Sequence, residues 1–118
     1  MATMTFKEVA QMIQAIGLPY SYYQFNNDTA IAPPFICYFY EGNNDVLADN
    51  SNYQKVETLA LELYTVEKDF VLENAVEHAL NNAGLVYSRE ETYIDSESLY
   101  EVIYTADVII REEEHDGE

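Results

Sequence analysis

The spacing of apolar residues predicts a helix at the start of the chain. Thr5 and Glu8 have the spacing of a capping box, in which each side chain caps the backbone of the other. Gly17 and Pro19 end the element, because glycine accepts a left-handed cap and proline cannot continue a helix. Within residues 5–16 the apolar side chains recur on one helical face: Phe6, Val9, Ala10, Ile13 and Ile16.

Strand patterns follow this helix. Residues 20–25 and 35–41 are rich in aromatic and β-branched side chains, and residues 53–65 alternate apolar with polar positions. Pro33 and Pro34 interrupt the first connection because they cannot donate to a ladder. The second connection is about ten residues long, whereas a hairpin usually needs two to five. We therefore expect a long polar loop between the second and third strands.

The second half of the chain predicts one more helix and a hairpin. Asp69 can cap a helix that runs to Asn82, and Gly84 ends it. Its apolar stripe is Leu72, Ala75, Val76, Ala79, Leu80 and Ala83. Residues 85–94 and 99–110 then pair across a turn at 95–98. On the last strand, alternate positions point one way: Tyr100, Val102, Tyr104, Ala106, Val108 and Ile110.

These elements indicate an α+β domain. The predicted fold is a two-layer sandwich, with a mainly antiparallel sheet of four to five strands and two helices packed on one face. A chain of 118 residues supports one hydrophobic core, so we expect a single domain over residues 1–111. Residues 112–118 are acidic and have nothing to bury, which predicts a disordered tail.

The charge balance narrows the possible partners. The chain has 22 acidic residues against five lysines and arginines, for a net charge of −17. Such a surface repels nucleic-acid phosphate and anionic lipid. We expect no membrane span and no signal peptide, since no segment has the required pattern. Three explanations stay open: solubility, a surface past which DNA can move without sticking, or imitation of DNA.

The chain offers little for catalysis or metal binding. Cys37, the single cysteine, lies in an apolar strand and predicts a small buried side chain in a reducing compartment. Counting from Asp45 or Asp49 does not give the glycine and glutamate that a calcium-binding hand requires. His78 and His115 are too few for a zinc site. We expect no catalytic residue, no metal and no cofactor, and hence a non-enzymatic protein.

Tyrosine is abundant in this chain, and its side chains are candidates for contacts with another subunit or protein. The chain has eleven tyrosines, several of them on neighbouring predicted strands. Aromatic side chains in excess on a sheet are typical of a subunit interface, although ordinary packing on strand faces explains many of them. The positions predicted to form an aromatic interface are Tyr20, Tyr22, Tyr38 and Tyr40.

The order of four segments resembles one known family. They are "AIGLPYSYYQF", "APPFICYFYEGNNDVLADNSNYQK", "LALELYTVEKDFVLENAVEHALNNAGLVYS" and "EETYIDSESLYEVIYTADV". Across residues 5–110 this arrangement resembles the tail terminator, or tail-to-head joining, proteins of long-tailed (siphovirus-type) bacteriophages and prophages. None of the segments is a catalytic signature, so the resemblance rests on their arrangement.

The resemblance implies a structural role in the virion. Such proteins form a ring, commonly a hexamer, on the head-proximal end of the tail tube. The ring stops tube growth and provides the surface that the head joins. The implied partners are other copies of the chain, the tail tube protein and a head-completion or neck protein, and genome DNA passes through the lumen without specific binding. The implied location is the virion tail, with the host cytoplasm during assembly.

The resemblance also implies a role for the long loop. Its polar ends and apolar centre suit a segment that docks on a neighbouring subunit or on the tube, although a simple spacer loop remains the alternative. The residues predicted to dock are Asn44, Asp45, Val46, Leu47, Ala48, Asp49 and Asn50. Two other functions stay open. Another neck component would share the fold, and a DNA-mimicking inhibitor would need carboxylates spaced like phosphates, whereas here they are dispersed.

Overall fold

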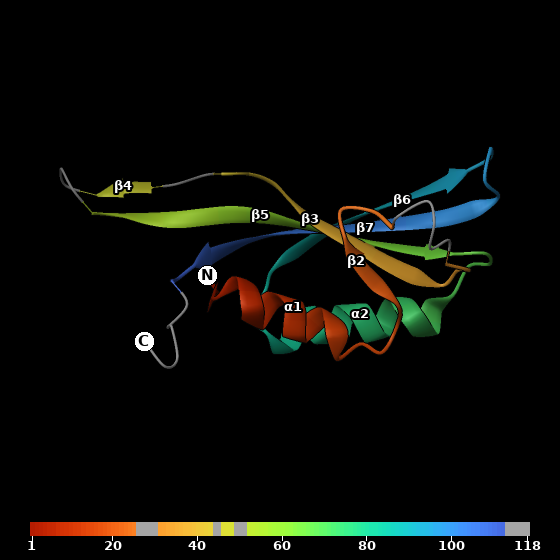
Figure 1. Ribbon diagram of the computed structural model, residues 1–118, viewed down its shortest axis with the longest axis horizontal. Helices are drawn as coiled ribbons and strands as arrows, with labels where there is room; N and C mark the ends of the chain where they lie inside the picture. The colour runs from red at the N-terminus through yellow and green to blue at the C-terminus, as the bar shows by residue number, and fades with distance from the viewer. Residues whose placement is uncertain (26–30, 44–45, 49–51, 113–118) are drawn as a thin grey trace.

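A computed structural model describes residues 1–25, 31–43, 46–48 and 52–112. Within these residues the chain forms two helices and seven strands, and both helices lie on one face of the sheet (Figure 1). In chain order the elements are β1 (Thr3–Met4), α1 (Phe6–Gln14), β2 (Tyr20–Tyr22), β3 (Phe35–Asn43), β4 (Val46–Ala48), β5 (Asn52–Thr65), α2 (Phe70–Asn82), β6 (Tyr87–Ile94) and β7 (Leu99–Ile110).

Both helices begin at the caps that the sequence predicts. The Thr5 hydroxyl accepts a hydrogen bond from the Glu8 backbone N–H at 3.0 Å, and the Thr5 N–H donates to Glu8 Oε1 at 2.9 Å. Asp69 Oδ1 accepts from the backbone N–H of Leu72 at 3.0 Å and starts α2. These side chains satisfy backbone donors that the first helical turn would otherwise leave unpaired.

The sheet is mixed, which corrects the expectation of a simple, mainly antiparallel sandwich of four to five strands. Its order is β1-β7-β5-β3-β2, with β6 also paired to β7 and β4 to β5. Two pairs, β1 with β7 and β2 with β3, run parallel. The strands cross steeply and the sheet curls above the helices (Figure 1). The α+β class and the two helices on one face are as predicted.

Two short edge strands account for the difference. β1 has two residues and β2 has three, too few to show a period-two pattern. β1 is held by long-range bonds, in which the Ile109 N–H donates to Ala2 O at 2.9 Å and the Arg111 N–H donates to Met4 O at 3.1 Å. β2 ends sooner than predicted because Tyr23 takes a left-handed conformation, with φ of 72°.

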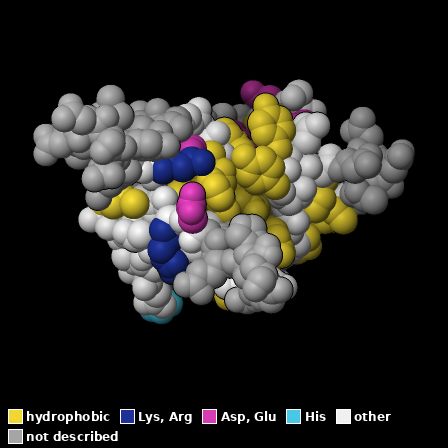
Figure 2. Space-filling view, turned by 60° about the vertical axis from the view of Figure 1, so that its left-hand side comes forward, with side chains coloured by type: hydrophobic (Ala, Val, Ile, Leu, Met, Phe, Trp, Pro, Cys, Tyr) yellow, Lys and Arg dark blue, Asp and Glu magenta, His cyan; other side chains and the backbone are white. Residues whose placement is uncertain are grey.

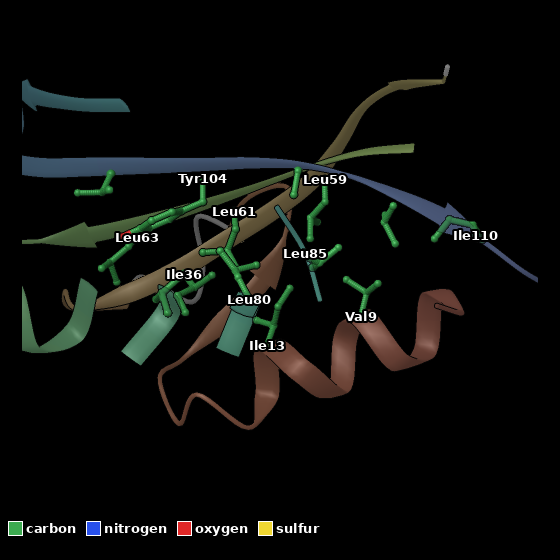
Figure 3. Packing of buried hydrophobic residues seen from close by; sticks show 14 residues of the cluster. Val9, Ile13, Ile36, Leu59, Leu61, Leu63, Leu80, Leu85, Tyr104 and Ile110 are labelled. Carbon is green, nitrogen blue, oxygen red and sulfur yellow. The ribbon is translucent and has the colours of Figure 1, made fainter. Parts of the chain in front are cut away.

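The hydrophobic core lies between the sheet and the helices. Figure 3 shows Val9 and Ile13 of α1 and Leu80 of α2 pointing toward the sheet, where Leu61 is among the side chains that meet them. As predicted, alternate residues of β7 face this core, from Val102 to Ile110. The predicted stripe of α2 is wrong at one position: Ala75 is exposed. An ion-paired glutamate, Glu73, is buried instead.

A hairpin arm replaces the expected long loop. β4 pairs with β5 in antiparallel register, with Val46 opposite Gln54 and Ala48 opposite Asn52. β7 ends with Ile110 opposite Lys55, so this part of the hairpin continues beyond the rest of the sheet (Figure 1). A shift in register between Tyr40 and Asn43 separates the arm from the body, as a β-bulge does. The molecule measures 50 × 33 × 25 Å.

Candidate interaction site

Three elements bring four aromatic rings together at one end of the helix-covered face. The register of the parallel pair sets Tyr22 of β2 opposite Tyr38 of β3, and strand alternation places Tyr40 on the same face as Tyr38. Phe6, at the start of α1, reaches the same place. The Tyr22 and Tyr38 rings lie 5.2 Å apart at 87°, and those of Phe6 and Tyr40 lie 5.1 Å apart at 71°.

These rings line a hollow of about 500 Å³, together with Glu57 of β5. We call this hollow the tyrosine pocket; it is lined by Phe6, Tyr22, Tyr38, Tyr40 and Glu57. Tyr22 and Tyr40 face each other with ring centroids 6.1 Å apart. Figure 2 shows hydrophobic side chains gathered in a patch, with Lys or Arg and Asp or Glu side chains beside it.

The predicted aromatic interface divides into packed and exposed members. Tyr20, Tyr38 and Tyr40 are half-buried and pack against the core, as ordinary packing would have them. Tyr22 is 53% exposed and lies at the sheet edge. Sequence reasoning named these four tyrosines together, and the structure places Tyr22, Tyr38 and Tyr40 around one hollow. Their role as an interface stays a prediction.

The hydroxyl of Tyr40 is buried in this pocket. No group in the described part of the chain forms a hydrogen bond with it. Burial raises the pKa of Tyr40, and the neighbouring Tyr38, Tyr22 and Glu57 add to the rise. Burial also raises the pKa of Tyr38. Both side chains therefore stay protonated, and each keeps a hydroxyl that can donate and accept hydrogen bonds.

The predicted docking loop is described only in its centre. Asn44, Asp45, Asp49 and Asn50 lie outside the described residues. The backbone of residues 46–48 is the strand β4 of the arm, so Val46, Leu47 and Ala48 are not the tip of an irregular loop. A paired strand is a more rigid way to carry a contact beyond the body than a polar loop would be. Whether these residues dock on another protein stays a prediction.

A second hollow lies between the two helices. It measures about 730 Å³ and its apolar lining includes Met12 and Ile16 of α1 and Val71, Ala75 and Ala79 of α2. His78, expected to be an ordinary surface residue, is exposed at its wall. Val71 is 77% exposed, so part of this apolar lining faces solvent.

The sheet face opposite the helices has an acidic pair that sequence reasoning missed. The Tyr64 hydroxyl donates to Glu101 Oε2 at 2.7 Å and lies 3.3 Å from Glu62 Oε1. Burial, together with the adjacent Glu101, raises the pKa of Glu62 to about 7. Burial also raises the pKa of the Cys37 thiol to about 11, and the same two carboxylates contribute. Cys37 is buried, as predicted.

Most of the few cations are held within the subunit. Lys68 lies 2.6 Å from Glu73 Oε2, and Arg89 pairs with the other carboxylate oxygen of Glu73. Arg111 pairs with Glu8 at 2.7 Å. The Lys55 ammonium lies 5.3 Å from the centroid of the Phe6 ring. The acidic surplus is therefore left largely without internal positive charge.

The described residues contain no cluster of three or more His, Cys, Asp or Glu side chains that could hold a metal ion. None of the helices described is long and apolar enough to cross a membrane.

Comparisons with known proteins find similarity at the level of fold. No protein-family model matches the sequence, and no curated protein matches it. A solved structure with a similar fold is a chain of the virion of a native gene transfer agent particle. The alignment covers 88% of each chain with a TM-score of 0.53 and 12% identical residues. At this identity the likeness shows a shared fold alone.

Proposed function

We propose that this protein is a non-enzymatic structural component of a phage or phage-like virion. The observation that carries the proposal is the fold likeness to a chain of a gene transfer agent virion, which extends over 88% of both chains. A likeness of this extent covers most of the chain rather than one motif. The sequence resemblance to phage tail proteins points in the same direction.

Within the virion, we propose the role of tail terminator. The protein would form a ring, a hexamer in the simplest case, at the head-proximal end of the tail tube, and it would stop tube growth and receive the head. The hairpin arm supports this role, because β4 and the start of β5 project past the end of β7. Such an arm gives each subunit a backbone edge with which to reach a neighbour or the tube.

The charge suits a channel for DNA. At −17 per subunit, a ring of six would have a formal charge of about −102. Carboxylates that face the lumen would repel the DNA backbone, so the genome would pass without adhering. The same charge would keep free subunits soluble during assembly in the host cytoplasm.

Disruption of the gene in a particle-producing strain tests this proposal. Electron microscopy should show tails of abnormally great length without heads, because nothing ends tube growth. Tails of normal length without heads would instead indicate the alternative function, that of another neck component. Normal tails joined to heads would overturn both roles.

The oligomeric state of the purified protein is a second test. Light scattering over a range of protein concentrations should give a species of about 82 kDa, six times the 13.6 kDa of the subunit. A monomer that also inhibits a DNA-binding enzyme at equal concentration would favour the DNA mimic and contradict a ring.

A further inference from the structure

We propose that the tyrosine pocket binds a cationic side chain, a guanidinium or an ammonium group, of a basic partner protein. The pocket combines several aromatic rings with one carboxylate around a hollow at the surface. This combination recognises organic cations, because the negative ring faces and the carboxylate attract positive charge together. The inference does not depend on the terminator role, since it concerns the chemistry of the ligand and not the position in a virion.

The ring geometry supplies walls in more than one orientation. Tyr22 stands nearly perpendicular to Tyr38, at 87°, and is tilted by 36° from Tyr40. Phe6 closes another side at 71° to Tyr40. A cation needs to lie within about 6 Å of a ring centroid for appreciable attraction. At centroid separations of 5.1 to 6.1 Å the neighbouring rings contact one another, so a cation would lie against the ring surfaces that line the hollow and not between the rings.

The carboxylate of the pocket completes the complementarity. Glu57 has no ion-pair partner among the residues that the structure describes, so its negative charge is available to a ligand. The hydroxyl of Tyr40 is buried out of reach of solvent, so Tyr40 contributes through its ring.

The aromatic surface already attracts a cation within the subunit. The ammonium of Lys55 lies over the ring of Phe6 at 5.3 Å, and Lys55 is not among the residues that line the tyrosine pocket. Lys55 thus engages one of the lining rings, and the rings of Tyr22, Tyr38 and Tyr40 remain for a further cation.

A basic partner fits better than a second copy of this chain. Lys68, Arg89 and Arg111 form ion pairs inside the subunit, Lys55 lies on its own Phe6, and the fifth cation, Lys7, is not free either. The net charge of −17 also opposes close approach of two copies and favours a protein of opposite charge. The pocket then serves as an anchor for one lysine or arginine in the centre of an interface.

Aromatic-carbon NMR of the full chain tests the inference directly. The probe is Nα-acetyl-arginine amide, and its neutral counterpart, Nα-acetyl-citrulline amide, has the same shape without the charge. We expect the arginine probe to shift the ring signals of Tyr22, Tyr38 and Tyr40, and to bind at least about threefold more tightly than citrulline. Equal effects of the two probes, or shifts spread evenly over all tyrosines, would overturn the proposal.

Matched substitutions separate the pocket from the general acidic field. Glu57→Gln and Glu90→Gln each remove one negative charge, but Glu90 is exposed on β6 and is not among the pocket residues. Tyr22→Leu and Tyr93→Leu each remove one exposed tyrosine, and Tyr93 pairs with Tyr100 at another place. Only Glu57→Gln and Tyr22→Leu should weaken binding, by about threefold or more. Equal losses with Glu90→Gln would show attraction by net charge alone, and the proposal would fail.

Arginine binding by the pocket can be tested separately from ring formation. Loss of arginine binding in Tyr22→Leu with an unchanged mass in light scattering would support the pocket regardless of subunit assembly. Tyr22 is at the edge and 53% exposed, so the variant is expected to stay folded. If the mass changed while arginine binding remained, Tyr22 would be a contact between copies and the cation site would be wrong.

Discussion

The hydroxyl of Tyr64 donates a hydrogen bond of 2.7 Å to Glu101, directly across the β5–β7 strand pair. Glu62 lies next to this bond, 3.3 Å from the same hydroxyl, on the sheet face without helices. Two carboxylates thus share one donor in a half-buried position. Burial disfavours the charged form of Glu62, and the hydrogen bond to Glu101 and repulsion from it act in the same direction, so the pKa of Glu62 rises to about 7.

This arrangement predicts a pH-dependent effect of Glu62→Gln. The pKa of Glu62 in the folded protein is above its ordinary value of 4.5. Protonation of Glu62 therefore stabilises the folded state, and this contribution is fully present below the ordinary pKa of 4.5. This contribution is lost as the pH rises through about 7. Glu62→Gln should therefore raise the free energy of unfolding at pH 8, by about 1–2 kcal/mol after discounting for solvent, and change it little at pH 5.

Urea denaturation at the two pH values measures this effect. Glu90→Gln is the control, because it removes one charge from an exposed position of β6. An equal gain at pH 5 and pH 8 would show that the ionisation of half-buried Glu62 is not its cause.

Because the carboxylate of Glu73 is buried, we predict that truncating this side chain lowers the stability of the protein. It is only 4% exposed and pairs with both Lys68 and Arg89, which joins α2 to β6. Glu73→Ala should lower the free energy of unfolding by about 2 kcal/mol, because Lys68 and Arg89 lose the buried one of their carboxylate partners, with Glu91 left to both, and a cavity opens. Thermal and urea unfolding measure the change. Glu97→Ala, in the exposed β6–β7 turn, should cost little; a loss of the same size there would refute the explanation.

We predict that the apolar residues of the arm contribute to assembly and little to folding. Val46→Asp combined with Leu47→Asp should leave the melting temperature nearly unchanged, since β4 lies beyond the body of the sheet. The same change should weaken ring formation or binding to the tail tube, because two apolar positions become charged. Light scattering and tube binding measure the effect. The control is Val86→Asp, which changes a position that is 88% exposed and lies outside the arm. If assembly were unaffected in the arm variant, the arm would be a spacer.

Burial of Cys37 predicts an unreactive thiol. Its pKa is raised to about 11, so very little thiolate exists near pH 7. Alkylation by iodoacetamide should be at least about tenfold slower in the native protein than in 6 M urea, because both access and ionisation are restricted. Mass spectrometry of timed samples follows the reaction. Equal rates in the two conditions would contradict the placement of Cys37 inside the sheet.

The sequence by itself determined the local elements. The Thr5 and Asp69 caps, the β6–β7 hairpin and the inward face of β7 follow from chemistry within a few residues, and the structure confirms each. The aromatic residues around the tyrosine pocket were recognisable in part, because Tyr22, Tyr38 and Tyr40 lie on strands whose faces can be read from alternation.

Only the tertiary structure decided how these elements meet. The short strands β1 and β2 exist because distant residues supply their hydrogen bonds, and β4 exists because β5 continues opposite it. Phe6 and Glu57 join the tyrosines only where α1 and β5 converge. Glu73 is buried on a helix because Lys68 and Arg89 neutralise it. Each of these features depends on contacts between residues far apart in the chain, whose free energy no local pattern contains.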